Sequence, residues 1–252
     1  MRAGSKVLIV ALVILVAAVG AGVWLYHSLD SIVAGALNTY GPEIVGAKFR
    51  VASVKIAPAS GAGEIHGLFI GNPEGFKTES ALTAATVSIE IDPSTLTDDV
   101  VLIRSIAIAA PAVTYETGPG GSNFDALQRN VMRGVKEKLG DKGRGDAKTE
   151  GPGKKIIIEH LTIRDAKASV NSPLLAGKTL TVPLPDIELR NIGKDQHGIA
   201  PAAAGGVIVS ALTQRVTAAA TGAISNFAKS GVEAVGKGVS NVQGGVKKLF
   251  GK

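Results

Sequence analysis

Apolar positions follow several patterns along this chain, and the first is an unbroken run. Val7–Tyr26 is apolar throughout and follows two cations, Arg2 and Lys6. At about 1.5 Å per helical residue the run is about 30 Å long, which matches the hydrocarbon thickness of a bilayer. The pattern predicts a transmembrane anchor within residues 1–27, with a cytoplasmic N-terminus and the remaining chain across the membrane.

A cleavable signal peptide is the alternative for this run, since Val19–Ala21 offers small residues at a plausible cleavage position. Signal peptides usually have apolar cores of about 7 to 15 residues, and this run is longer, which favours the anchor. Either interpretation predicts export of the body that follows.

Helical spacing of apolar residues continues after the run and then gives way to alternation. His27–Tyr40 has apolar residues at helical spacing and predicts a stalk helix that stops at Gly41 and Pro42. From Phe49 the period is two, which predicts antiparallel strands with one dry and one wet face. The expected strands of this first block are 49–57, 64–70, 85–91, 100–109 and 112–115.

Two segments separate the strand blocks. Ser122 followed by Asp125 resembles a capping box, and apolar residues then recur at every fourth position from Leu127 to Leu139, which predicts a helix that packs on the sheet. Residues 140–153 are rich in Gly, Lys, Asp and Arg without a bulky apolar residue, so they predict a flexible linker.

Alternation returns in a second strand block after the linker. The expected strands are 155–164, 166–170 and 180–190. The apolar phase shifts by an odd number of residues near Ser53 and again across Pro185, and each shift predicts a β-bulge.

The C-terminal segment is rich in Ala, Gly, Val, Ser and Lys and predicts helix. Its last part carries a heptad seam with steps of three and four residues, and Lys229, Lys237, Lys247 and Lys248 lie off this seam. Five glycines there each cost about 1 kcal/mol relative to Ala, so the helix needs a partner. The candidates are the domain's own sheet, a partner helix or a membrane surface. The residues of this predicted contact are Val232, Val235, Val239, Val242, Val246, Leu249, Lys237, Lys247 and Lys248.

Charge and composition narrow the chemistry. The net charge of +6 concentrates in two segments: residues 129–155 carry nine basic and four acidic side chains, and residues 194–252 carry seven and two. These segments could face anionic headgroups or form solvated helix faces. The absence of cysteine excludes disulfides and thiol chemistry. Because the predicted export separates the body from the cytosol, we do not expect nucleic acid as a partner.

Residue patterns that carry catalysis or metal binding are absent from the sequence. His27, His66, His160 and His197 stand apart, without a His-x-x-x-His pair or a carboxylate at ligand spacing. No nucleophile elbow occurs. We therefore expect a protein that is not an enzyme, with no cofactor and no metal.

Three turn motifs carry a resemblance to a known family. Gly67–Phe76 reads GLFIGNPEGF, Ile106–Pro111 reads IAIAAP and precedes Glu116, and Ser122–Leu127 reads SNFDAL. In this order they resemble AsmA-like proteins of the Gram-negative envelope, over about residues 1–195. The resemblance implies a β-rich periplasmic body on an inner-membrane anchor, with a role in outer-membrane biogenesis and, for long members, lipid transfer along an apolar groove. This chain is short, so it resembles a single module.

The sequence thus predicts an α+β fold: an N-terminal transmembrane helix, an antiparallel, curved β-meander with packing helices, and a C-terminal amphipathic helix. The expected parts are residues 1–27, 28–139, 140–153, 154–195 and 196–252. Two uses of the dry sheet face remain open. It either lines a groove for acyl chains or forms the closed core of an envelope scaffold that binds other envelope proteins. The expected groove residues are Val87, Ile89, Ile91, Ile106 and Ile108.

Overall fold

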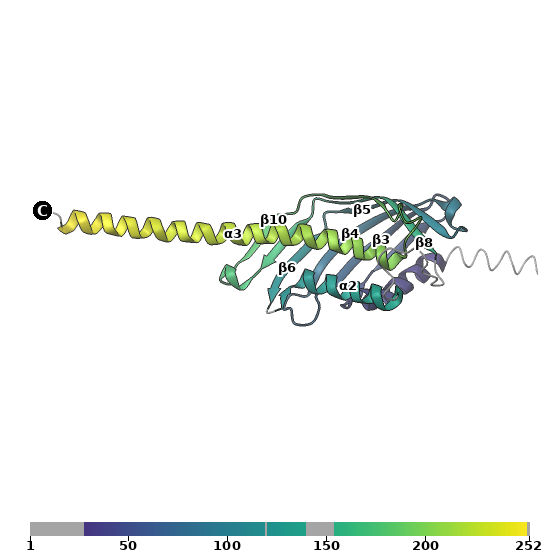
Figure 1. Ribbon diagram of the computed structural model, residues 1–252, viewed down its shortest axis with the longest axis horizontal. Helices are drawn as coiled ribbons and strands as arrows, with labels where there is room; N and C mark the ends of the chain where they lie inside the picture. The colour runs from purple at the N-terminus through teal and green to yellow at the C-terminus, as the bar shows by residue number, and fades with distance from the viewer. Residues whose placement is uncertain (1–27, 119, 140–153, 251–252) are drawn as a thin grey trace, which may run out of the picture.

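The computed structural model describes residues 28–118, 120–139 and 154–250, with side chains for all of these except 137–139 and 231–250. Over this part of the chain the fold is α+β: three helices accompany an 11-stranded mixed sheet that does not close into a barrel (Figure 1). The predicted anchor within residues 1–27 and the predicted linker, 140–153, lie outside the described residues.

The strands lie close to where alternation predicts them. β5 and β8 begin and end at the predicted residues, and the other predicted strands are present with shifted ends. The strands are β1 (Phe49–Arg50), β2 (Ser53–Ala57), β3 (Ala62–Gly71), β4 (Ser80–Ile91), β5 (Val100–Ala109), β6 (Ala112–Gly118), β7 (Gly121–Ser122), β8 (Lys155–Arg164), β9 (Lys167–Asn171), β10 (Thr179–Pro183) and β11 (Ile187–Ile192).

The predicted all-antiparallel meander is wrong in its second half. β1 to β6 pair antiparallel along the chain, as expected. β8 then lies parallel to β5, and β9 lies parallel to β6. The chain crosses over between β6 and β8 through a helix, and a connection that includes a helix is what parallel neighbours require. β10 and β11 form the far edge of the sheet, where β10 pairs antiparallel with β9 and β11 pairs antiparallel with β8.

Apolar side chains form continuous rows across this sheet. One row runs through six strands by direct cross-strand pairing: Val54, Ile65, Val87, Ile108, Ile163 and Ile187. A second row crosses β6 and its neighbours: Ile70, Leu82, Val113, Ala168 and Val182. Directly opposite residues share a face, so each row is a band of one face.

An odd number of residues separates the two rows on every strand, as in Ile108 to Val113. In a regular strand that step would turn one row to the opposite face. Residues with positive φ lie between the rows on β3, between β5 and β6, and between β8 and β9: Gly67 (63°), Ala110 (46°) and Asp165 (55°). β4, which lies between β3 and β5, has none. Along this line of irregularities the pairing keeps one register, so no residue is inserted, and both rows contribute to one apolar cluster.

The two predicted β-bulges are not present as inserted residues, because pairing with the neighbouring strands keeps one register across both expected sites. Register shifts occur instead at Ile70 and Gly71 of β3 and at Glu90 and Ile91 of β4. β1 and β2 are interrupted at Val51 and Ala52, next to the expected site at Ser53. β10 and β11 are separated by residues 184–186, which include the expected site at Pro185. Sequence alternation thus located interruptions of the two outer strands, but its prediction of bulges there was wrong, and it did not indicate the irregularities of the central strands.

The first described helix covers residues 28–45 and continues past Gly41 and Pro42, where the sequence predicted its end. Gly41 lets the helix pack closely against Phe49, because a Cβ at this position would clash with Cδ1 of the Phe49 ring. The helix ends instead at Gly46, which has φ of 62° and donates its N–H to the carbonyl of Pro42. A glycine in this left-handed conformation is a common helix stop.

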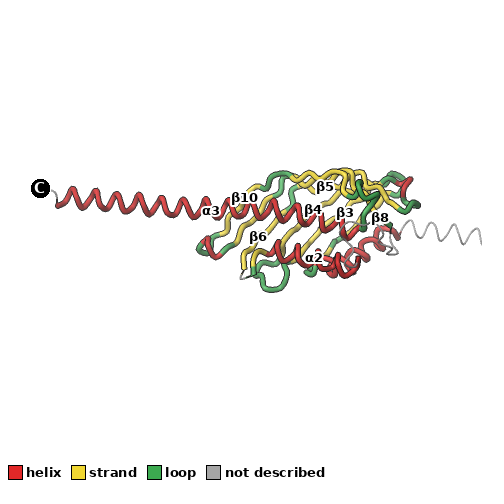
Figure 2. The backbone as a smooth tube through the Cα atoms, in the orientation of Figure 1, coloured by secondary structure: helices red, strands yellow, loops and turns green. Residues whose placement is uncertain are grey.

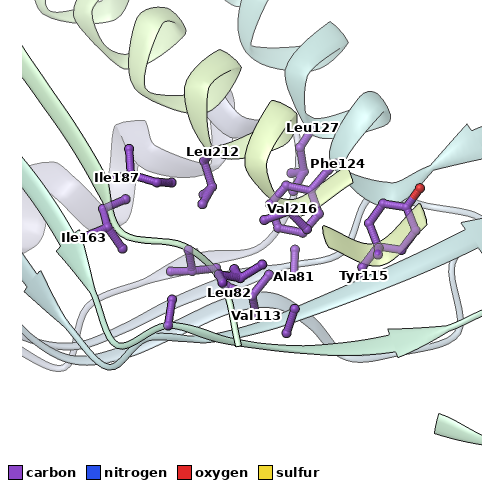
Figure 3. Packing of buried hydrophobic residues seen from close by; sticks show 14 of the residues in the cluster. Ala81, Leu82, Val113, Tyr115, Phe124, Leu127, Ile163, Ile187, Leu212 and Val216 are labelled. Carbon is purple, nitrogen blue, oxygen red and sulfur yellow. The ribbon is translucent and has the colours of Figure 1, made fainter. Parts of the chain in front are cut away.

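Two further helices lie over one face of the sheet (Figure 2). α2 (Asn123–Leu139) begins one residue after the predicted start and buries Leu127 and Val131 of its predicted stripe. α3 (Pro201–Phe250) packs along α2 and over β6 and β8 to β11. Figure 3 shows Leu212 and Val216 of α3 above the sheet residues of the central cluster.

Candidate functional site

The five predicted groove residues come together on one face of β4 and β5. Val87 pairs directly with Ile108, and Ile89 pairs with Ile106. Ile91 pairs with Ile103, which sequence analysis did not include, and Val87 pairs on its other side with Ile65 of β3. We call these residues the β4–β5 patch; its members are Ile65, Val87, Ile89, Ile91, Ile103, Ile106 and Ile108.

The apolar side chains of the sheet are well buried on the β8–β11 side and become more exposed toward the β4–β5 patch. Ile158, Leu161 and Ile163 of β8 are at most 2% exposed, because α3 packs on this side of the sheet. The patch residues are only partly buried, apart from Val87, which is 5% exposed. The sheet therefore presents partly accessible apolar surface beside a fully covered core.

The helix over residues 28–45 borders the patch on the other side. Its Asp30 carboxylate accepts a hydrogen bond from the backbone N–H of Ile56 at 2.8 Å. Its Asn38 side chain accepts from the N–H of Val51 and donates to the carbonyl of the same residue, at 2.8 and 3.1 Å. These bonds satisfy backbone groups of the outer strand, so they protect this edge of the sheet against further strand pairing.

The opposite face of the same strands is polar. Ser88 and Glu90 alternate with the patch residues on β4 and are exposed. Arg104 of β5 lies 2.9 Å from Asp92 and 3.8 Å from Glu90. A side-chain hydrogen bond from Ser94, followed by one from Arg104, lowers the pKa of Asp92 to about 2. The sheet thus has the dry and wet faces that the alternation predicted.

The open end of the patch lies at the end of the body where the described chain begins. Asp30 is bonded to Ile56, and Ile56 belongs to the same cross-strand row as Ile89 and Ile106. Residue 28 follows the predicted anchor almost directly. The apolar surface is therefore close to the place where the chain would leave a bilayer if Val7–Tyr26 spans it.

Groups that could bind a metal do not gather in the described part of the chain, where no cluster of three or more His, Asp or Glu side chains has suitable geometry. His66 lies 3.2 Å from Glu64 and 3.3 Å from the hydroxyl of Thr86, on the wet face. The patch itself offers only hydrocarbon. The chemistry that this arrangement supports is the binding of apolar groups.

Polar residues of the three turn motifs form one hydrogen-bond network. Asn123, at the start of α2, is fully buried. Its Nδ2 donates to Oδ1 of Asn72 at 2.7 Å and to the carbonyl of Thr114 at 2.6 Å, and its Oδ1 accepts from the N–H of Glu116 at 2.9 Å. The motif residues thus join the 72–79 loop, β6 and α2, and their role in this chain is structural.

Glu116 holds the other half of the network. Its carboxylate accepts from the N–H of Lys77 and from both the N–H and the hydroxyl of Thr78, at 2.8, 2.8 and 2.5 Å. Burial alone would raise the pKa of Glu116, but the hydrogen bonds from Thr78 and Lys77 outweigh burial and lower it. A carboxylate bound to turn N–H groups in this way fixes the loop between β3 and β4.

The predicted C-terminal contact has a mixed outcome. α3 confirms the predicted helix, and Leu212, Val216 and Ala220 of its first half are buried against the sheet. The side chains of the predicted contact, from Val232 to Leu249, lie outside the described side chains. Figure 1 shows that the helix carrying them leaves the sheet, so the sheet does not cover this segment.

Within the described residues one segment, Pro201–Ser230, is long and apolar enough to cross a membrane by length and composition alone. Its Leu212, Val216 and Ala220 are buried in the core, and 22% of its most apolar stretch is buried in all. Comparisons of the chain with protein-family models, curated proteins and solved structures find no match.

Proposed function

We propose that this protein is a membrane-anchored, non-catalytic lipid-handling protein of the Gram-negative envelope, with its body in the periplasm. The observation that carries the proposal is the β4–β5 patch. Seven apolar side chains lie together on one sheet face, and six of them keep partial access to solvent. Partly accessible apolar surface next to a rigid core is a suitable site for acyl chains.

Two features of the sequence support this assignment. The first is the resemblance of the turn motifs to AsmA-like proteins, whose long members are linked to lipid transfer. The second is the apolar run Val7–Tyr26, which is separated by one residue from the described helix over 28–45. An anchor there would hold the open end of the patch near the inner membrane. A single module of this size would then accept or pass on lipid locally.

The proposal can be tested by crosslinking in membranes. A photoreactive amino acid is placed at Ile89 or Ile106 in the full-length chain, membranes are irradiated, and lipid adducts are measured by mass spectrometry. The expected result is an adduct at both positions, because both side chains belong to the patch.

The matched controls are Ser88 and Ala107, which pair with each other on the opposite face of the same two strands and are both exposed. Simple exposure to lipid would label these controls at least as strongly as the patch. Adducts confined to positions 89 and 106 support the proposal. Equal labelling on both faces, or no labelling at either, contradicts it.

The alternative is an envelope scaffold or accessory subunit with a closed apolar core and no lipid cargo. Val87 favours it locally, since this central patch residue is 5% exposed. In that case other envelope proteins would be the partners, and the photoreactive patch positions would crosslink to protein or within the chain.

A further inference from the structure

α3 extends far beyond the body that it helps to build. Its first half packs on the sheet as far as Phe227, which belongs to the apolar cluster and lies under the ammonium group of Lys178 at 5.6 Å. The helix then continues to Phe250. Figure 1 shows this last part clear of the sheet and of every other described element. At about 1.5 Å per residue, residues 231–250 span about 30 Å.

A free helix of this composition would not be stable by itself. Isolated helices are marginal in water even when they are rich in alanine. Residues 231–250 contain five glycines, each of which costs about 1 kcal/mol relative to alanine in a helix. Because the described part of the body supplies no packing surface there, this stretch needs a partner other than the described elements of the body.

The sequence of this stretch specifies the kind of partner. Its apolar residues form a heptad seam, with Val232, Val239 and Val246 at the first core position. The second core position carries Val235, Val242 and Leu249. β-Branched residues at the first position with leucine at the second, as in Val246 and Leu249, favour two-stranded parallel coiled coils, whereas β-branched residues at both positions, as in the first two heptads here, favour three or four strands.

Charge is compatible with pairing of identical helices. Six positions flank the seam. They are occupied by Gly231, Gly236, Gly238, Gln243, Gly245 and Phe250. None of these residues is charged, so two copies would meet without repulsion at the interface. Lys237, Lys247 and Lys248 fall at outer heptad positions.

We propose that residues 231–250 form a parallel coiled coil with the same segment of other copies of this chain. The direction of the chain supports the parallel arrangement. α3 starts beside β8, where Ile199 pairs with Ile156, at the same end of the sheet as residue 28. It then runs to the opposite end. Two copies held in one membrane have their α3 helices pointing the same way, and confinement to the membrane raises their effective concentration.

The chain contains no cysteine, so single cysteines test the proposal directly in full-length protein. V232C and V239C each place a thiol in the proposed seam, and K237C places one on the outer side of the same helix. Membranes or detergent-solubilised protein are treated with a mild oxidant, and the disulfide-linked dimer is measured on a non-reducing gel.

The expected result is strong dimer formation for V232C and V239C and several-fold less for K237C. An antiparallel pair would bring residue 232 next to residue 249 of the other copy, so crosslinking of V239C without V232C contradicts the parallel arrangement. Equal crosslinking of all three variants indicates random collision and overturns the proposal. Absence of dimer, or a crosslink to a different protein only, overturns self-association. Lipid adducts at Ile89 do not depend on any of these outcomes.

Discussion

Removal of the Asn123 side chain tests whether the turn motifs hold the fold together. In Asn123→Ala, three hydrogen bonds disappear: the two that Nδ2 donates to Asn72 and Thr114, and the one that Oδ1 accepts from Glu116. A typical intramolecular hydrogen bond contributes about 1 kcal/mol net, and a buried N–H left without an acceptor costs about 1–3 kcal/mol. Together these effects predict a loss of about 4–6 kcal/mol in the free energy of unfolding.

Asn130→Ala is the matched control, since it makes the same chemical change on the same helix. Asn130 donates one exposed hydrogen bond, to the carbonyl of Gly46 at 3.1 Å, so its loss should cost less than about 1 kcal/mol. Urea unfolding of both variants, followed by far-ultraviolet circular dichroism, gives the two values under identical conditions. If Asn123→Ala were no less stable than Asn130→Ala, the structural role assigned to the network would be wrong.

Three further predictions concern the same body. The pKa of Glu116 is lowered in the folded state. Its ionised carboxylate therefore stabilises the fold above the ordinary carboxyl pKa, and this stabilisation is lost as the pH falls through the lowered pKa. In Glu116→Gln the urea midpoint should depend less on acid pH. Gly67→Ala should lower the free energy of unfolding by about 1–3 kcal/mol, because φ is 63° and the added Cβ would lie 2.8 Å from the Cβ of Ala52. Gly75→Ala is the comparison variant: its φ is 95°, but the added Cβ would meet open space, so the loss in the same unfolding assay should be smaller. Leu212→Ala should lower the unfolding free energy by about 2–5 kcal/mol, and Val207→Ala, which is 45% exposed, by less than about 0.5 kcal/mol.

Alternation of apolar and polar residues predicted individual strands well because it records which face of a strand is buried. β5 and β8 were predicted to the residue for this reason. The same alternation does not record which strand lies alongside, or in which direction. Val100 pairs with Lys155 across a long stretch of chain, and a parallel and an antiparallel neighbour bury the same residues. The mixed sheet therefore could not be read from the local pattern.

The patch and the line of irregularities differ in how visible they are in the sequence. Val87 and Ile89 of the predicted group alternate with polar residues, and Ile106 and Ile108 alternate with small residues. The register of β4 with β5 brings them together. The irregularity at Ala110 gave no such signal, since neither Ala nor its neighbour Pro111 predicts a positive φ. Only the odd spacing between Ile108 and Val113 indicates an irregularity there, and this spacing can be interpreted only when both rows are known to share one face.

Chain direction places the two proposed contacts at opposite ends of the body. The partly accessible patch ends near Asp30, where the described chain starts, and α3 carries residues 231–250 away from that end. An anchor before residue 28 would hold the patch close to the bilayer and direct the free part of α3 outward. A helix directed away from the bilayer cannot lie in its surface at the same time. With such an anchor, this geometry would favour a protein partner for residues 231–250 over the inner membrane, and the β4–β5 patch would be the surface that faces lipid.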